Sequence, residues 1–63
     1  PFHHDTVAAV LPLLAAKMAP GGVVLCETER EANLPEQAGA LTLVKQYNYG
    51  KIKVSRYERG EEA

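Results

Sequence analysis

The sequence has little of what usually holds a small free-standing domain together. Its 63 residues contain one cysteine, Cys26, so no intramolecular disulfide is possible. No cluster of metal-ligating residues stands out, although small domains usually add disulfides, a metal or a partner. A chain of this length buries only roughly 60% of its unfolded surface. We therefore expect a part of a larger folded unit, and the start at Pro1 without an initiator methionine favours the same expectation.

Long apolar runs and targeting signals are also missing. No run approaches the roughly 18 apolar residues of a membrane span, and the first residues lack the charged lead of a signal peptide. We expect no membrane partner and a reducing, cytoplasmic compartment.

Net charge is small as well, with a formal value of −1, which argues neither for nor against a nucleic-acid partner. The distribution is more informative, because five of the seven basic residues lie within residues 40–59. Such a cluster is typical of a surface that faces phosphates, or of a solvated protein face. These basic residues are Lys45, Lys51, Lys53, Arg56 and Arg59.

The stretch at residues 23–26 is apolar without interruption and follows a Pro-Gly-Gly breaker at residues 20–22. This pattern predicts a parallel-type strand that is buried on both faces. Glu27 and Glu29 follow at its carboxyl end, where open α/β sheets place their ligand crevice. Because they are two residues apart, both should point to one side. They either orient neighbouring groups at the rim or face a substrate as an acid/base pair.

An amphipathic helix of about four turns is expected before this strand. Asp5 or Thr6 is the expected N-cap, because a short oxygen-bearing side chain accepts from the amides of the first turn. Pro12 should either kink the helix or mark its true start. The predicted apolar face consists of Val7, Val10, Leu11, Leu14 and Met18.

A polar loop at residues 30–39 and an antiparallel hairpin are expected after Glu29. Its strands are residues 40–47 and 51–59, joined by a turn at residues 48–50 where Asn and Gly tolerate positive φ. Alternation places Leu41, Leu43 and Lys45 opposite Thr42, Val44 and Gln46, and Ile52, Val54 and Arg56 opposite Lys51, Lys53, Ser55 and Tyr57. The fold class is therefore α/β, with one helix, one parallel-type strand and a closing antiparallel hairpin.

Four features in this order resemble the closing part of a known family. They are Pro1-Phe2, the turn at residues 19–22, Glu27-Thr28-Glu29 followed by Leu34-Pro35, and Tyr49-Gly50-Lys51 continuing through Val54, Arg56 and Tyr57. The family is the Rossmann-like S-adenosylmethionine-dependent methyltransferases. More narrowly, the chain resembles the bacterial enzymes that methylate the exocyclic N2 amine of one guanine in small-subunit (16S) rRNA.

The resemblance implies that residues 1–63 are the C-terminal portion of a single methyltransferase domain. S-adenosylmethionine would then be bound by an upstream part, and the chain alone would be inactive. It also implies that the strand at residues 51–59 inserts antiparallel between residues 23–26 and 40–47, which leaves residues 40–47 at the sheet edge.

By the same resemblance, Pro1 and Phe2 are the catalytic residues. Phe2 would stack on the guanine, which is worth about 1 to 3 kcal/mol, and Pro1 would keep its loop rigid; a core aromatic is the alternative for Phe2. The partner implied is 16S rRNA or the small ribosomal subunit. The predicted RNA-binding residues are Tyr49, Lys51, Lys53 and Arg56, and the alternative for the lysines is a charged edge that blocks sheet association.

Two other features suggest chemistry that we do not expect. His3, His4 and Asp5 lack zinc-type spacing, so we interpret them as a loop or helix cap and expect no metal. Cys26 in a buried strand is interpreted as a small hydrophobic residue.

Two other functions stay open from the residues. One is a related methyltransferase for DNA or protein amines, and the other is a non-enzymatic RNA-binding module. As a part of a larger sheet, the isolated chain is expected to self-associate or to be partly disordered, because its central strand lacks the parallel neighbour.

Overall fold

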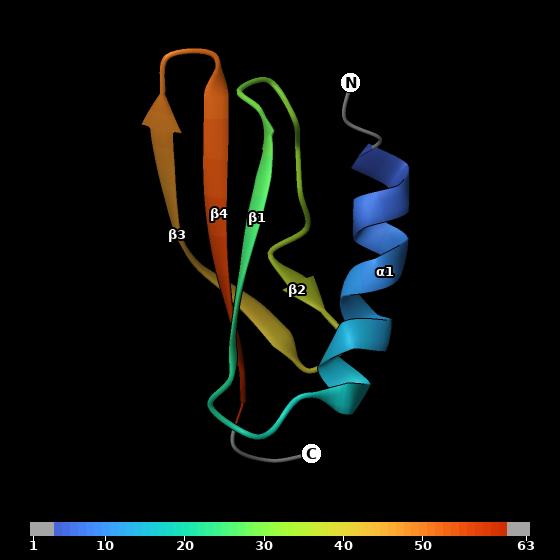
Figure 1. Ribbon diagram of the computed structural model, residues 1–63. Coiled ribbons are helices and arrows are strands. Elements are labelled where there is room, and N and C mark those ends of the chain that lie inside the picture. The colour runs from blue at the N-terminus through green and yellow to red at the C-terminus, as the bar shows by residue number, and fades with distance from the viewer. Residues whose placement is uncertain (1–3, 61–63) are drawn as a thin grey trace.

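One helix packs against one face of a four-stranded sheet (Figure 1). The structure is a computed structural model that describes residues 4–60, with the side chains of residues 9–60. The strand order is β1-β4-β3-β2, and all three strand pairs within residues 4–60 are antiparallel. The elements are α1 (His4–Lys17), β1 (Val23–Glu29), β2 (Gln37–Ala38), β3 (Leu41–Tyr49) and β4 (Ile52–Arg59).

Helix α1 runs through Pro12 without a break. The N-cap prediction is wrong, because Asp5 and Thr6 both lie inside the helix, and the helix does not begin at Pro12. Near its end, Arg59 Nε donates to the carbonyl oxygen of Ala15 at 2.8 Å, and a cation suits this terminus of a helix. No helix in the described part of the chain is long and apolar enough to cross a membrane.

Among the side chains of α1 that the structure describes, residues 9–17, only those of Leu11 and Ala15 are buried. Leu11 and Ala15 pack with Ala38, Leu41 and Tyr57 to form the core. The predicted apolar face is therefore only partly correct: Val10 and Leu14 are exposed, Met18 is half-buried, and the side chain of Val7 lies outside the described part. The physical reason is that the described sheet covers only one side of the helix.

Strand β1 alternates between covered and exposed side chains, so the prediction of burial on both faces is wrong for residues 4–60. Val24 and Cys26 pack toward the core, whereas Val23 and Leu25 are 46% and 65% exposed. The parallel-type pairing is also not seen, because β1 pairs within the described residues with β4, antiparallel. The helix covers one sheet face, and a parallel partner would have to lie along the other edge of β1.

The insertion of the last strand is confirmed, since β4 lies between β1 and β3. The predicted turn is shorter than expected. Tyr49 pairs with Ile52, so Gly50 and Lys51 form a two-residue turn, and Asn48 belongs to β3. Gly50 has φ +60°, which suits glycine at the first position of such a hairpin turn.

Strand β2 lies in the stretch that was predicted to be a loop. Because β2 pairs with β3, the prediction that residues 40–47 lie at the sheet edge is only partly correct. Gln37 and Ala38 pair with the first two residues of β3, while the rest of that edge has no partner strand in the described chain. The β2–β3 turn contacts the helix at Gly39, which has φ +62°. A Cβ on Gly39 would lie 3.1 Å from the Cβ of Pro12.

A β-bulge at Val44 changes which residues of β3 face the helix. Leu43 pairs with Tyr57 and Lys45 pairs with Arg56, so Val44 has no partner in β4. The predicted alternation is wrong from this point on, because an extra residue in one strand inverts the side-chain phase. Leu43 points toward the core, whereas Lys45 lies on the opposite face with Arg56.

Candidate functional site

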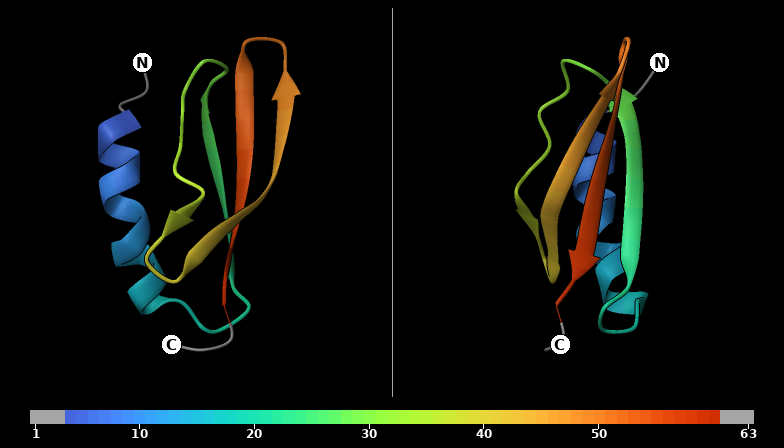
Figure 2. Two further views of the ribbon diagram at one scale, coloured as in Figure 1. Left: turned by 180° about the vertical axis from the view of Figure 1, so that it is seen from behind. Right: turned by 90° about the vertical axis from the view of Figure 1, so that its left-hand side faces the viewer.

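The sheet has one covered and one bare face. In the right panel of Figure 2, α1 lies behind the strands, and no other described element covers the face in front. We call this the open face. Since directly paired antiparallel residues share a face, the register assigns to it Val23, Leu25, Glu27 and Glu29 of β1, Ile52, Val54, Arg56 and Glu58 of β4, and Lys45, Tyr47 and Tyr49 of β3.

The four predicted RNA-binding residues do not form one cluster. Tyr49 and Arg56 lie on the open face, and Lys51 is exposed in the β3–β4 turn. Lys53 lies on the helix-facing side, where its Nζ donates to the carbonyl oxygen of Ala32 at 2.9 Å. Their assignment to RNA stays a prediction, with Lys53 separated from the other three by the sheet.

Two residues outside that predicted set lie beside Tyr49 on the open face. The Tyr47 and Tyr49 rings stack with centroids 6.3 Å apart and planes 15° apart. Lys45 Nζ lies 5.2 Å from the centroid of the Tyr47 ring, within the range of a cation–π interaction. We call these three residues the tyrosine strip. The sequence shows that these residues alternate along the strand, two positions apart. It does not show the bulge at Val44 that places them on the open face.

Charges of both signs surround the strip. Arg56 lies directly across from Lys45, and its guanidinium contacts the carboxylate of Glu58 at 2.9 Å. Both side chains are partly exposed, so the ion pair contributes little to stability. Glu27 and Glu29 share one side of β1 as predicted and are exposed. They lie two strand spacings from β3, about 10 Å across the sheet.

The loop at residues 30–36 is attached to the helix-facing side of the sheet. Tyr57 donates its hydroxyl proton to the carbonyl oxygen of Pro35 at 2.5 Å, and Lys53 holds Ala32. At the start of the loop, Arg30 N donates to the carbonyl oxygen of Lys51 at 2.8 Å. The loop leaves β1 at the end of the molecule that also carries the start of α1 and the β3–β4 turn (Figure 1).

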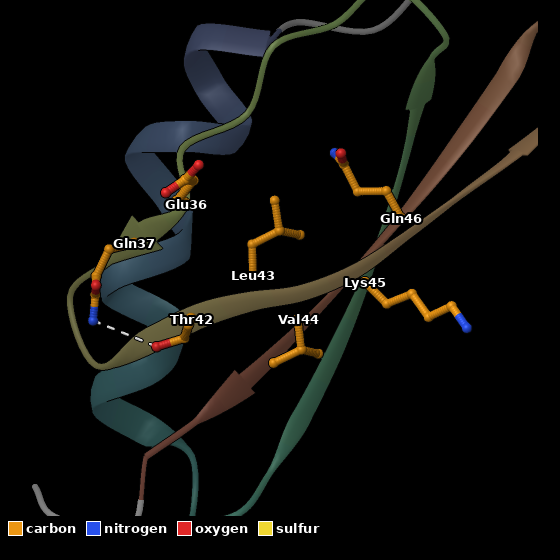
Figure 3. Close-up of a pocket in the computed structure, with 7 residues that line it drawn as sticks. All are labelled: Glu36, Gln37, Thr42, Leu43, Val44, Lys45 and Gln46. Atoms are coloured by element: carbon orange, nitrogen blue, oxygen red, sulfur yellow. Dashed lines mark hydrogen bonds between the residues drawn. The ribbon is translucent and has the colours of Figure 1, made fainter.

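A pocket of about 330 Å³ lies beside the bulge, at the edge of β3 (Figure 3). Leu43 projects into the space between Glu36 and Gln46, while Lys45 points away. Within the described residues, no buried side-chain nitrogen or oxygen lacks a hydrogen-bond partner. The lining residues are Glu36, Gln37, Thr42, Leu43, Val44, Lys45 and Gln46.

Nucleophilic and metal chemistry find no support in the described part. Burial raises the pKa of the Cys26 thiol, which keeps the sulfur protonated and unreactive. Among residues 4–60, no group of three His, Cys, Asp or Glu side chains is placed to hold a metal ion. Pro1, Phe2 and His3 lie outside the described residues.

Comparison with known proteins identifies a family. No curated protein and no solved structure matches the chain. A family described as "Conserved hypothetical protein 95" matches residues 1–58, and this family consists of methyltransferases. The match covers nearly the whole chain, and the chain therefore belongs to this methyltransferase family.

Proposed function

We propose that the chain is the C-terminal portion of an S-adenosylmethionine-dependent methyltransferase that modifies the exocyclic N2 amine of a guanine in 16S rRNA. The observation that carries the proposal is the strand order, with β4 inserted antiparallel between β1 and β3. This is the order that the resemblance to the rRNA guanine methyltransferases implies. Membership of a methyltransferase family supports the same chemistry.

The β1 side of the open face supports the place of the chain within a larger domain. Val23 and Leu25 present apolar side chains to solvent from β1, and such surface favours burial by a further layer. The outer edge of β1 is where a parallel neighbour would pair. The family implies S-adenosylmethionine as methyl donor, and the proposal assigns its binding to the remainder of the domain.

The chemistry requires precise orientation of the base. The lone pair of a guanine amine is delocalised into the ring, so groups that accept from the amine and hold the base in plane favour the transfer. In the proposal, Phe2 stacks on the guanine and Pro1 keeps its loop rigid. Helix α1 follows these residues in the sequence, and it begins at the end of the sheet where β1 ends (Figure 1).

The direct test is methyl transfer by the longer protein that carries this chain. Labelled S-adenosylmethionine is supplied with 16S rRNA, small ribosomal subunits, DNA or protein, and the modified nucleoside is identified after digestion. We expect N2-methylguanosine in the ribosomal RNA. Label in DNA or protein instead would overturn the substrate assignment and favour the related amine methyltransferases.

A pair of Phe2 variants tests the stacking role in the same assay. Loss of base stacking costs about 1 to 3 kcal/mol, so Phe2→Ala should lower kcat/KM by at least about fivefold. Phe2→Tyr retains an aromatic ring and should stay near the wild-type rate. Equal rates for Phe2→Ala and the wild type would remove Phe2 from the site.

A cofactor titration separates the proposal from the RNA-binding module. Calorimetry with S-adenosylmethionine should detect binding by the longer protein and none by the 63-residue chain. Absence of binding by both would favour the non-enzymatic module.

A further inference from the structure

We propose that the tyrosine strip, formed by Lys45, Tyr47 and Tyr49, is a stacking and phosphate-binding platform for single-stranded RNA. The choice of RNA rests on the proposed function. The platform itself rests on the geometry and charge of β3 and of the β3–β4 turn.

The ring geometry suits base stacking. The two tyrosine rings are nearly parallel, with an interplanar angle of 15°, and Tyr49 is 63% exposed. Exposed aromatic side chains on a sheet surface are the groups on which RNA-binding domains stack unpaired bases. The third tyrosine differs, because Tyr57 is fully buried and its hydroxyl is bound to Pro35. Tyr47 and Tyr49 thus present aromatic surface that the core does not use.

The nearby charges suit a phosphate backbone. Lys45 Nζ lies 5.2 Å from the Tyr47 centroid, and Lys51 is exposed in the turn next to Tyr49. Arg56 is directly across the strand pair from Lys45. Arg56 is also paired with the Glu58 carboxylate on this face, whereas the carboxylates of Glu27 and Glu29 lie one strand farther away, on β1. An RNA strand that follows β3 therefore meets cations and aromatic faces.

Tyrosine fluorescence gives a direct readout, because the chain has three tyrosines and no tryptophan. The 63-residue chain is titrated, at concentrations at which sedimentation shows a monomer, with a single-stranded RNA of about ten nucleotides, within the usual site size. Stacked bases should quench the emission of Tyr47 and Tyr49. Tyr57→Phe removes the buried tyrosine and should leave the quenched signal in place. No quenching and no binding by the wild type would overturn the proposal.

Variants of Tyr49 test the stacking itself. Tyr49→Leu should weaken RNA binding by about 5- to 150-fold, which corresponds to 1 to 3 kcal/mol per stacked base. Tyr49→Phe keeps the ring and should bind like the wild type. Circular dichroism establishes that both variants fold, as expected for a side chain that is mostly exposed. Equal affinities for Tyr49→Leu and Tyr49→Phe would show that the ring is not stacked on a base.

The salt dependence of binding tests the phosphate contacts. Lys45→Gln should weaken binding to all RNA sequences and reduce the slope of log K against log salt by about 0.7, the value for one contact to a single strand. Lys17→Gln, at the end of α1, is the matched control and should leave the slope unchanged. Identical slopes for the two variants would contradict the role of Lys45.

The arms of the experiment separate this proposal from others. Single-stranded DNA of the same sequence offers the same stacking and phosphate contacts, so tighter binding of DNA than of RNA would overturn the choice of RNA. If variants of the tyrosine strip lose RNA binding but the longer protein shows no methyl transfer, the platform is supported and the proposed function is wrong. Full methyl transfer with unchanged RNA affinity in the same variants would remove the platform alone.

Discussion

Tyr57 joins the core to the loop that precedes β2. Its ring is fully buried, and its hydroxyl donates to the carbonyl oxygen of Pro35. Tyr57→Phe should lower the free energy of unfolding by about 1 kcal/mol, because one hydrogen bond is lost in a partly buried setting. Urea denaturation measures the change. Tyr47→Phe on the open face is the control and should change stability by less than about 0.5 kcal/mol; equal losses would contradict the role of the Pro35 contact.

The titration of two buried groups should lower the stability of the folded chain at alkaline pH. Burial raises the pKa of the Cys26 thiol, and burial followed by the nearby Cys26 raises the pKa of Tyr57. Each group holds its proton more tightly in the folded state, so its stabilisation is complete below the unfolded pKa and is lost as the pH rises through the folded one. The free energy of unfolding should therefore fall above about pH 8.5, the ordinary thiol value.

Denaturation in urea from neutral pH to about pH 10, the ordinary tyrosine value, measures this fall. Cys26→Ala removes the thiol and should make the decrease smaller. A decrease of the same size in Cys26→Ala would exclude the thiol as a cause.

At the scale of the elements, the turns at Gly39 and Gly50 make a matched pair. Both glycines have positive φ, so alanine at either position costs about 1 to 2 kcal/mol of backbone strain. At Gly39 the new Cβ also meets Pro12, 3.1 Å from its Cβ, whereas nothing lies within 4 Å at Gly50. Gly39→Ala should therefore destabilise the chain more than Gly50→Ala in thermal denaturation. The opposite order would mean that α1 shifts away from the turn without cost.

The elements also show what the sequence predicted and what it did not. The alternation of β4 was predicted, with Val54 and Arg56 on the face opposite Ser55 and Tyr57, and the structure confirms it. The prediction did not say which of the two faces lies inward. The bulge was not predicted, because Val44 is an ordinary strand residue and carries no glycine signal. Strand β2 was missed because only two residues pair, inside a polar stretch.

The candidate site was also predicted only in part, because the face on which a strand residue lies depends on alternation and register. Tyr49 and Arg56 were predicted to bind RNA, and the structure places both on the open face. Lys53 has the same charge, but strand alternation and its bond to Ala32 place it on the other side. Alternation along β4 had already predicted that Lys53 and Arg56 lie on opposite faces, whereas the facing of Lys45 on β3 depended on a bulge that the sequence does not signal.

For the whole molecule, the open face predicts association. Val23 and Leu25 expose apolar side chains next to an edge of β1 that has no partner strand in the described chain. Apolar surface beside a free strand edge favours pairing between copies. Sedimentation velocity over a concentration series should show self-association of the 63-residue chain.

Leu25→Lys should shift this equilibrium toward the monomer, since a charge in the apolar patch opposes burial against a second copy. Lys17→Gln, on the helix, is the control and should leave it unchanged. A wild-type chain that stays monomeric at all concentrations, with a sharp cooperative melt, would contradict the prediction.

The contact between Pro12 and Gly39 has a consequence for evolution. It joins residues from separate elements, the middle of α1 and the β2–β3 turn, so closely that a Cβ on Gly39 would lie 3.1 Å from the Cβ of Pro12 and one of the two would have to shift. A relative that carries a side chain at the position of Gly39 should have a compensating change opposite, at the position of Pro12. In an alignment of the family, these two columns should therefore covary.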